Sequence, residues 1–391
     1  MKGPVSILDN DLYKFSMQNA FIKLFPNDIV QYSFINRGRH QFPSGFDKEL
    51  QRIVNEFAGL QLTEDEYDYL HEKIYYFDRA YIDFLKGYKF NPHEVNITQH
   101  DAELTVDIQG PIYKSILWEV PLLSIISELY YEMTKQKAKD GWSKTIRQKI
   151  EDFKRLGIVV SEFGTRRRFA YDIQKTLCEL ITLYGQGSFT GTSNLHFAMV
   201  NNLTPIGTQA HEWYMFHAAK YGYWMANEIG MQNWINVYKG NLGIALTDTF
   251  TTEVFLRSFN IVYAKLHDGV RADSGNPLIY ADQLIEHYNM LRIDPKTKII
   301  VFSDNIKSLS MLENIQCVCK GRIQDRYGIG TWLSNDCGCT PMNMVIKMAA
   351  VLVDDTFIPT VKLSDDTLKH TGKLDEIKRC MTTLRIGTDN G

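Results

Sequence analysis

The chain has 391 residues, of which 44% are hydrophobic and 12% are aromatic, so it can bury more than one core of ordinary size. We therefore expect two domains, or one barrel with additions. The formal net charge of −3 argues against a general binder of nucleic acid or anionic membranes, because both need a basic face that neutralises phosphates. The most apolar long stretch is interrupted by Glu119 and Glu128, so we expect neither export nor a membrane span.

The first part of the chain, residues 1–145, mixes helical and strand patterns without a regular alternation. Thr63 is followed three residues later by Glu66, a capping box that predicts an amphipathic helix over 63–77. The segment 96–113 alternates apolar and polar residues as two antiparallel strands do. We place a domain boundary near the GWSK segment at 141–144.

The rest of the chain alternates short β-branched runs with helical segments, which indicates a parallel α/β architecture. The runs expected to be strands are GIVVSEF, GSFTGTS, TPIGT, LGIALTD, NIVYAKLHDGV, KIIVFSD and QCVCKG. Each run leads into a cluster of small or charged residues. In a barrel of parallel strands the loops at the carboxyl ends gather on one face, so we expect these clusters to surround one mouth.

The clusters together offer cations, carboxylates and unblocked backbone amides. The members are Arg166, Arg167, Arg168, Arg271, His211, Asp248, Asp273, Asp304 and the glycine-rich stretch 328–331. A polyphosphorylated substrate carried with magnesium needs these groups. Each group alone has a simpler explanation, namely a solvated helix start, a turn or a helix N-cap, and only their recurrence at the same topological position favours a site.

His211 follows a predicted strand end in TPIGTQAHEW. A histidine there can be a core or capping residue. With Asp248 at the end of the next predicted strand, it also resembles a base or nucleophile that a carboxylate orients. We therefore predict that Asp248 fixes the tautomer of His211 and leaves the other ring nitrogen free to react.

The six cysteines lie at positions 178, 317, 319, 337, 339 and 380, in a chain that we expect to be cytoplasmic and free of disulfides. Two C-x-C pairs, Cys317 with Cys319 and Cys337 with Cys339, raise the question of a metal site. Structural zinc more often uses C-x2-4-C spacing, and we expect Cys317 and Cys319 to pack on an apolar strand.

A series of motifs, in order along nearly the whole chain, resembles the nicotinate phosphoribosyltransferase family. The motifs are DLYKFSMQNA, WEVPLLSIISELYY, SEFGTRRR, GTSN, GTQAHEW, LTDTF, VRADSGNP, FSDNI, YGIGT, PMNMVIK and KLSD. The resemblance implies an irregular (β/α) barrel, residues 146–350, with an α+β cap domain built from residues 1–145 and the C-terminal segment 351–391. It also implies a homodimer with active sites shared between subunits.

The same resemblance implies a glycosyltransferase reaction in NAD salvage biosynthesis. The 5-phosphoribosyl group of phosphoribosyl pyrophosphate passes to nicotinate, with Mg²⁺ as cofactor, and pyrophosphate leaves. ATP hydrolysis coupled through a phosphohistidine at His211 would make the enzyme a ligase. Asp248 is the second residue expected to be catalytic.

Binding roles are carried over by position. Tyr13, expected from the neighbouring subunit, and Phe163 match the aromatic pair that sandwiches the pyridine ring, and Arg271 and Ser193 are expected beside nicotinate. The residues expected at the phosphoribosyl and phosphate groups are Arg166, Asp273, Ser303, Asn305, Gly328, Gly330 and Thr331. Three adjacent arginines, 166–168, compete for one phosphate contact.

Three other functions compete with this interpretation. The first is the sister reaction on nicotinamide, which would share the barrel, the histidine and the aromatic pair. The second is a barrel aldolase that forms a Schiff base, for which Lys265 is the one tempting lysine and would have to be buried on a strand. The third is a non-catalytic binding protein that has kept the barrel.

Overall fold

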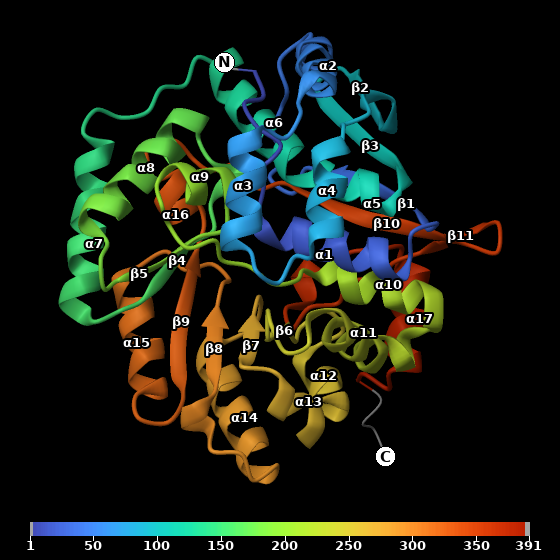
Figure 1. Ribbon diagram of the computed structural model, residues 1–391, viewed down its shortest axis with the longest axis vertical. Coiled ribbons are helices and arrows are strands. Elements are labelled where there is room, and N and C mark those ends of the chain that lie inside the picture. The colour runs from blue at the N-terminus through green and yellow to red at the C-terminus, as the bar shows by residue number, and fades with distance from the viewer. Residues whose placement is uncertain (1–2, 388–391) are drawn as a thin grey trace. The chain divides into compact units, whose positions relative to one another are not determined.

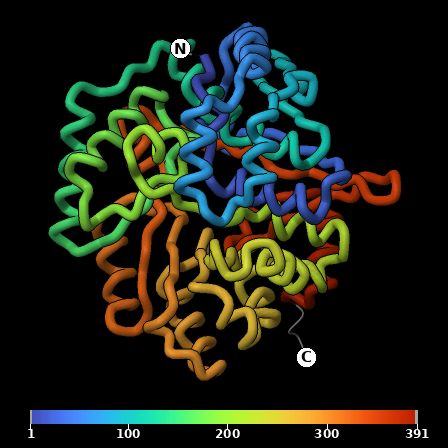
Figure 2. Tube along the Cα trace, viewed as in Figure 1, coloured from blue at the N-terminus to red at the C-terminus, as the bar shows by residue number. Residues whose placement is uncertain are grey.

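The computed structural model describes residues 3–387 (Figure 1). The chain divides into two compact units. Unit one comprises the residues up to Ile22, Gln31–Gly207 and Ile329–Lys347, and unit two comprises Lys23–Val30, Thr208–Gly328 and the residues from Met348 onwards. Each unit is thus assembled from separated stretches of chain, which can be followed by colour along the trace in Figure 2. The division into domains 1–145, 146–350 and 351–391 stays a prediction.

Unit one contains most of the helices of the N-terminal half and two small groups of strands. The helices are α1 Leu12–Leu24, α2 Phe46–Glu56, α3 Glu64–Lys73, α4 Arg79–Gly87, α5 Ile112–Ser115, α6 Glu119–Met133, α7 Trp142–Leu156, α8 Tyr171–Tyr184, α9 Leu195–Val200 and α16 Thr331–Ser334, with the short 3₁₀ helices η1 Phe57–Gly59, η2 Pro92–Glu94, η3 Ile116–Trp118 and η4 Thr165–Arg167. The strands are β1 Ile29–Ile35, β2 Val95–His100, β3 Glu103–Pro111, β4 Val160–Glu162 and β5 Phe189–Thr192.

The expectations for the N-terminal part are largely confirmed. The side chain of Thr63 accepts a hydrogen bond from the amide of Glu66, and the Glu66 carboxylate accepts one from the amide of Thr63, so the capping box forms and α3 begins at Glu64. The helix ends at Lys73 rather than at 77. Strands β2 and β3 pair antiparallel, with Val95 opposite Ile108.

Unit two contains four parallel strands that alternate with helices. The strands are β6 Ile244–Leu246, β7 Gly269–Ala272, β8 Ile299–Phe302 and β9 Gln324–Ile329. The antiparallel pair β10 Val345–Val353 and β11 Thr356–Pro359 follows, and the first three residues of β10 belong to unit one. The helices are α10 His211–Tyr221, α11 Tyr223–Tyr238, α12 Thr252–Ser258, α13 Ile261–Leu266, α14 Pro277–Met290, α15 Leu309–Cys319 and α17 Leu374–Thr383, with η5 Pro295–Thr297 and η6 Thr367–Lys369.

The parallel strands β6, β7, β8 and β9 are neighbours in that order, so their carboxyl ends lie along one edge, as Figure 1 shows. The pairing of β7 with β8 requires a glycine at its start, because a Cβ at Gly269 would lie 2.0 Å from the carbonyl oxygen of Ile299. Val270 and Ile300 are fully buried in the middle of these strands. The predicted gathering of strand ends is therefore confirmed within unit two, and the fold is α/β with a parallel sheet.

Two predicted strands, QCVCKG and TPIGT, are wrong, and NIVYAKLHDGV is right only at its end, where Gly269 and Val270 begin β7. QCVCKG belongs to α15, because Leu312, Ile315 and Cys319 recur at helical spacing on its buried face, and the strand β9 follows it. In NIVYAKLHDGV the side chain of Asn260 caps a short helix, α13, before β7 begins. TPIGT contributes only an isolated bridge between Thr192 and Pro205.

Candidate active site

His211 is the first residue of α10, and its ring is held from both sides. Nδ1 lies 3.0 Å from Oγ1 of Thr249, and Nε2 lies 3.0 Å from Oδ2 of Asp273. The histidine side chain is only 4% exposed. Because both partners follow the carboxyl ends of β6 and β7, the sheet itself fixes the orientation of the imidazole.

Asp273 is a partly buried carboxylate, with 27% of its side chain exposed, that several donors stabilise. Ser303 donates a hydrogen bond of 2.8 Å to Oδ1, and Nη1 of Arg271 lies 3.6 Å from the same oxygen. Burial alone would raise the pKa of Asp273, but Arg271, His211 and Lys362 hold it well below its usual range. The group is therefore ionised at neutral pH and acts only as an acceptor.

Asp248 does not play the part expected from the sequence. Its Oδ2 accepts a short hydrogen bond from Ser274, and among the described residues its buried Oδ1 has no hydrogen-bond partner. The expected pairing with His211 is therefore wrong, and Asp273 takes that place, because the end of β7 reaches the ring. Burial raises the pKa of Asp248 to about 6, with Asp273 adding to the effect and Lys362 opposing it.

Arg271 lies on β7 between these groups and the strand end of β8. Besides its ion pair with Asp273, Nη1 lies 3.5 Å from Oγ of Ser303, and Nη2 donates to the carbonyl oxygen of Gln209 at 3.3 Å. His211, Arg271, Asp273 and Ser303, all singled out from sequence, are thus linked through contacts with one another. We call these four residues the histidine cluster.

The loop after β8 carries Asp304 and Asn305. Asn305 has a φ of 50° and donates to the Asp304 carboxylate, which also accepts from Lys369 at 2.6 Å. Lys369 belongs to η6, a segment from which no site residue was expected. The carboxylate of Asp304 is therefore already balanced by a cation of its own chain.

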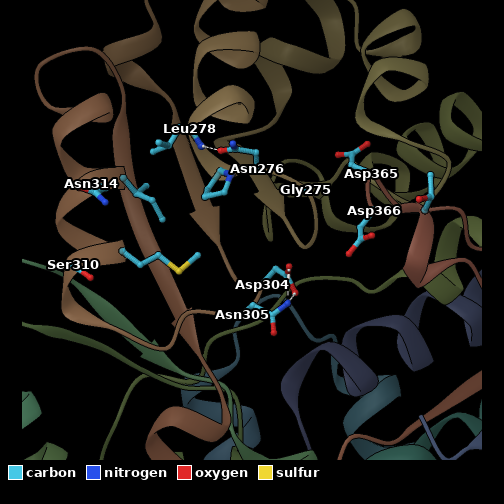
Figure 3. Close-up of a pocket in the computed structure, with 13 residues that line it drawn as sticks. Gly275, Asn276, Leu278, Asp304, Asn305, Ser310, Asn314, Asp365 and Asp366 are labelled. Carbon is cyan, nitrogen blue, oxygen red and sulfur yellow. Dashed lines mark hydrogen bonds between the residues drawn. The ribbon is translucent and has the colours of Figure 1, made fainter. Parts of the chain in front are cut away.

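A cavity of about 790 Å³ lies in unit two at the ends of β7 and β8. Figure 3 shows Asp304 and Asn305 on its floor, with Asp365 and Asp366 on one side and Ser310 and Asn314 on the other. Apolar side chains of α14 and α15 complete the wall; they are Pro277, Leu278, Met311 and Ile315. The cavity and the histidine cluster are neighbours in sequence. Ser303 directly precedes Asp304, and Ser274 lies between Asp273 and Gly275.

Two arginines of the predicted phosphate group have different surroundings in unit one. Arg168 is 5% exposed and forms two hydrogen bonds of 2.8 Å to the carboxylate of Asp9, so it serves the core. Arg166 lies in η4, is 36% exposed and approaches Glu119 at 3.5 Å. Arg166 and Arg167 therefore remain the candidates for a phosphate contact.

Glu119 links Arg166 to a buried lysine. Lys14 is fully buried, with its Nζ 2.5 Å from Oε2 of Glu119. Burial alone would raise the pKa of Glu119, but Lys14, Lys347 and Arg166 lower it to about 2. This ion pair fixes the first turns of α1 and α6, on which Tyr13 also depends for its position.

Ser193 is hydrogen-bonded to the start of α1, next to Tyr13. The amide of Leu12 donates to the carbonyl oxygen of Ser193 at 2.7 Å, and the Ser193 hydroxyl donates to Asp11 at 2.8 Å. These contacts lie within one chain. The expectation that Tyr13 serves a neighbouring subunit concerns an assembly and stays a prediction.

Phe163 and the glycine-rich stretch meet beyond the end of β4. The amide of Phe163 donates to the carbonyl oxygen of Ile329 at 2.8 Å, and a Cβ at Gly330 would lie 3.3 Å from the Phe163 carbonyl oxygen. Thr331 begins α16, and Gly328 lies in β9. The close backbone approach explains why a small residue stands at 330.

The cysteine pairs differ from the expectation of an apolar strand. Cys317 is exposed and Cys319 is buried on α15, while Cys337 is buried and Cys339 is partly exposed in the loop after α16. Within residues 3–387, no group of three or more His, Cys, Asp and Glu side chains is placed to hold a metal ion. The tempting Lys265 of the aldolase alternative is exposed on α13 rather than buried on a strand.

Sequence reasoning missed several residues around the histidine cluster and the loops beside it. They are Thr249, Ser274, Lys362, Asp365 and Lys369. The motifs LTDTF, VRADSGNP and KLSD contain four of them and were noted for the resemblance. Serine, threonine and lysine residues at a site do not recur at a characteristic sequence spacing. Only the contacts in the folded protein show that these residues belong to the site.

Comparison with known proteins identifies the family. The model of the nicotinate phosphoribosyltransferase (NAPRTase) family matches residues 158–386, and the model of its N-terminal domain matches residues 8–127. The chain therefore belongs to the nicotinate phosphoribosyltransferase family.

Individual relatives are similar over nearly their full length. The nicotinate phosphoribosyltransferase of Chromohalobacter salexigens is 46% identical over 384 residues, which cover 97% of this chain and 98% of the relative. The crystal structure of nicotinate phosphoribosyltransferase from Porphyromonas gingivalis has a TM-score of 0.95 at 41% identity and covers 98% of this chain and 100% of that one. The crystal structure of nicotinate phosphoribosyltransferase from Vibrio cholerae has a TM-score of 0.92 at 29% identity and covers 98% of this chain and 95% of that one.

No described helix is long and apolar enough to cross a membrane.

Proposed function

We propose that this protein transfers the 5-phosphoribosyl group of phosphoribosyl pyrophosphate to nicotinate and releases pyrophosphate. The observation that carries the proposal is the match to the family along both parts of the chain, including every strand end that carries the histidine cluster. Under this proposal the family's barrel is the parallel sheet closed on itself, residues 146–350, with a cap built from residues 1–145 and 351–391.

The chemistry needs charge stabilisation more than it needs a base. The pyridine nitrogen attacks the anomeric carbon with its own lone pair while the bond to pyrophosphate breaks, and positive charge develops on the ribose. The fixed carboxylate of Asp273 suits this ribose, where it would accept from the hydroxyls and balance the charge. Ser303, Asn305, Gly328, Gly330, Thr331 and Arg166 would hold the phosphate groups.

Nicotinate recognition falls to aromatic and cationic side chains. Tyr13 and Phe163 would stack on the two faces of the pyridine ring, with Ser193 nearby. Arg271 would offer its guanidinium to the nicotinate carboxylate. Because Arg271 already contacts Asp273 and Ser303, the same residue would couple the base to the ribose.

ATP coupling would pass through His211. Nε2 of His211 lies 3.0 Å from Oδ2 of Asp273. Because an ionised carboxylate can only accept, Asp273 would keep the proton of the neutral ring on Nε2 and leave the other ring nitrogen for reaction with the γ-phosphorus of ATP. Phosphorylation would place a dianion beside Arg271 and favour productive binding and pyrophosphate release. Asp248 would act from its place beside Ser274 rather than on the ring itself.

Magnesium fits the cavity only as a partner of the substrate. Mg²⁺ is typically bound through one or two carboxylates together with substrate phosphates, and Asp304, Asp365 and Asp366 supply carboxylates at the cavity wall. When bound with pyrophosphate, the ion would neutralise charge on the leaving group.

The remaining parts of the proposal are a homodimer with shared sites, a cytoplasmic location and a role in NAD salvage.

The proposal is tested by following pyrophosphate release with nicotinate and phosphoribosyl pyrophosphate, with and without ATP. We expect release with nicotinate that ATP stimulates, and slower release with nicotinamide. Labelled ATP with magnesium should give an acid-labile, alkali-stable phosphoprotein, and His211→Ala should abolish the label. Preference for nicotinamide would reassign the substrate, and binding without turnover would indicate a non-catalytic protein.

A further inference from the structure

Glu162, the last residue of β4, is a fully buried carboxyl group that has no part in the reaction as described so far. We propose that Glu162 is a positioning residue for nicotinate recognition, which joins the strand end that carries Phe163 to the strand end that carries Ser193. The inference rests on the proposed function, in which these two side chains lie beside nicotinate. Glu162 would act on substrate affinity only through these neighbours.

The side chain of Glu162 holds the turn that contains Phe163. Oε1 of Glu162 accepts a hydrogen bond of 2.6 Å from the amide of Gly164, so one side chain connects the residues on both sides of Phe163. The turn is held from its other side as well, because Oγ of Ser334 donates to the carbonyl oxygen of Gly164 at 2.9 Å. The backbone of Phe163 therefore leaves β4 in a fixed direction, and this direction limits where its ring can lie.

Glu162 also holds the end of β5, through two contacts. Its carbonyl oxygen accepts from the amide of Ser193 at 2.8 Å, and its Oε2 accepts from the hydroxyl of Thr192 at 2.6 Å. Thr192 is the last residue of β5, so the carboxyl group fixes the position just before Ser193. The pairing of β4 with β5 is irregular between Val160 and Ser161, so these contacts add a constraint where the backbone ladder is interrupted.

The surroundings of the carboxyl group are built to donate. Gln174 of α8 donates to Oε2 at 3.1 Å, and its own carbonyl oxygen accepts from Arg168 at 3.1 Å, so its amide nitrogen faces Glu162. Burial raises the pKa of Glu162, and the donors Thr192, Gln174 and Gly164 oppose the rise without cancelling it. A buried carboxyl group whose hydrogen-bond partners are all neutral costs free energy that an apolar residue would avoid. Its contacts at the two strand ends account for its presence.

The kinetic test changes the acceptor and leaves the expected nicotinate contacts in place. Glu162→Gln keeps the shape of the side chain but turns an NH2 group towards groups that donate. We expect the KM for nicotinate to rise roughly tenfold, as for a lost hydrogen bond to a charged acceptor. Because binding of nicotinate is what is lost, kcat and the KM for phosphoribosyl pyrophosphate should stay within about twofold. A purely structural role would instead lower the Tm and the active fraction and leave the KM for nicotinate unchanged.

A matched pair of variants at Thr192 tests the link to β5. Thr192→Val keeps the shape and removes the hydroxyl that donates to Glu162, whereas Thr192→Ser keeps the hydroxyl. We expect the KM for nicotinate to rise about three- to tenfold in Thr192→Val and to stay near the wild-type value in Thr192→Ser. In the double variant with Glu162→Gln the two effects should be less than additive, because both changes remove the same contact. The Thr192 pair decides the question if Glu162→Gln does not fold.

The outcomes separate this inference from the proposed function. If the wild type uses nicotinate but Glu162→Gln and Thr192→Val keep its KM, or change only kcat and Tm, the positioning role is wrong and the proposed function stands. An equal rise of the KM in Thr192→Ser and Thr192→Val would assign the effect to packing and also overturn the role. If the wild type releases no pyrophosphate with nicotinate, the proposed function fails, and the positioning role fails with it.

Discussion

Replacing Asp248 with asparagine should make the protein more stable at neutral pH while it impairs activity. The carboxyl is fully buried, and its pKa rises from 3.8 to about 6 because burial penalises the charged form. The native state therefore binds more protons than the unfolded state between these values, so wild-type stability falls as the pH rises through this window. The asparagine side chain would keep the shape and the acceptor for Ser274 without a charge.

The size of the gain follows from the two pKa values. At about 1.4 kcal/mol per pH unit between them, the ionised carboxylate costs up to about 3 kcal/mol at pH 7 and about 1.5 kcal/mol at pH 5. For a chain of this length, about 3 kcal/mol corresponds to a rise in Tm of about 3 to 4 °C. The rise should shrink as the pH falls through this window and vanish well below pH 3.8, where the carboxyl is protonated in both states.

The assay is differential scanning calorimetry of the wild type and Asp248→Asn at equal protein concentration from pH 5 to 8. Asp68→Asn, a change at an exposed position of α3, serves as the matched control and should shift the Tm little at any pH. A variant that is less stable at pH 7, or a difference that does not change with pH, would refute the reasoning, because the positive charge of Lys362 would then compensate the carboxylate fully.

Three further predictions concern residues with contrasting roles. Arg168→Ala should lower the free energy of unfolding by about 3 to 5 kcal/mol, since it leaves a buried carboxylate unpaired, whereas Arg166→Ala should change thermal stability little and lower activity. Mixing inactive Tyr13→Ala and His211→Ala proteins under subunit exchange should restore some activity, and no recovery despite exchange would place each site in one chain. Arg271→Ala should lower kcat/KM for nicotinate more than tenfold and affect nicotinamide little, while equal losses would mean that the residue only braces the phosphoribosyl side.

Much of the fold could be read from local signals. The Thr63 capping box and the alternation over 96–113 depend on neighbours within a few residues, and both form as expected. The short runs that became β4 to β8 ended in small or charged residues, and parallel pairing alone then brings the ends of β6 to β8 to one edge. QCVCKG was assigned wrongly because a short apolar run fits a buried helix face as well as a strand.

The sequence by itself determined the family, the α/β class and the candidate residues, because these depend on residue order and on patterns that repeat along the chain. Only the tertiary structure decided which side chains meet. In the folded protein His211 contacts Asp273 and Thr249, and Asp248 accepts a hydrogen bond from Ser274 instead. Arg168 is buried and pairs with Asp9. Such choices are made over sequence separations of tens of residues and within fractions of an ångström, by strand register and by which buried donors need acceptors, and no local pattern carries that information.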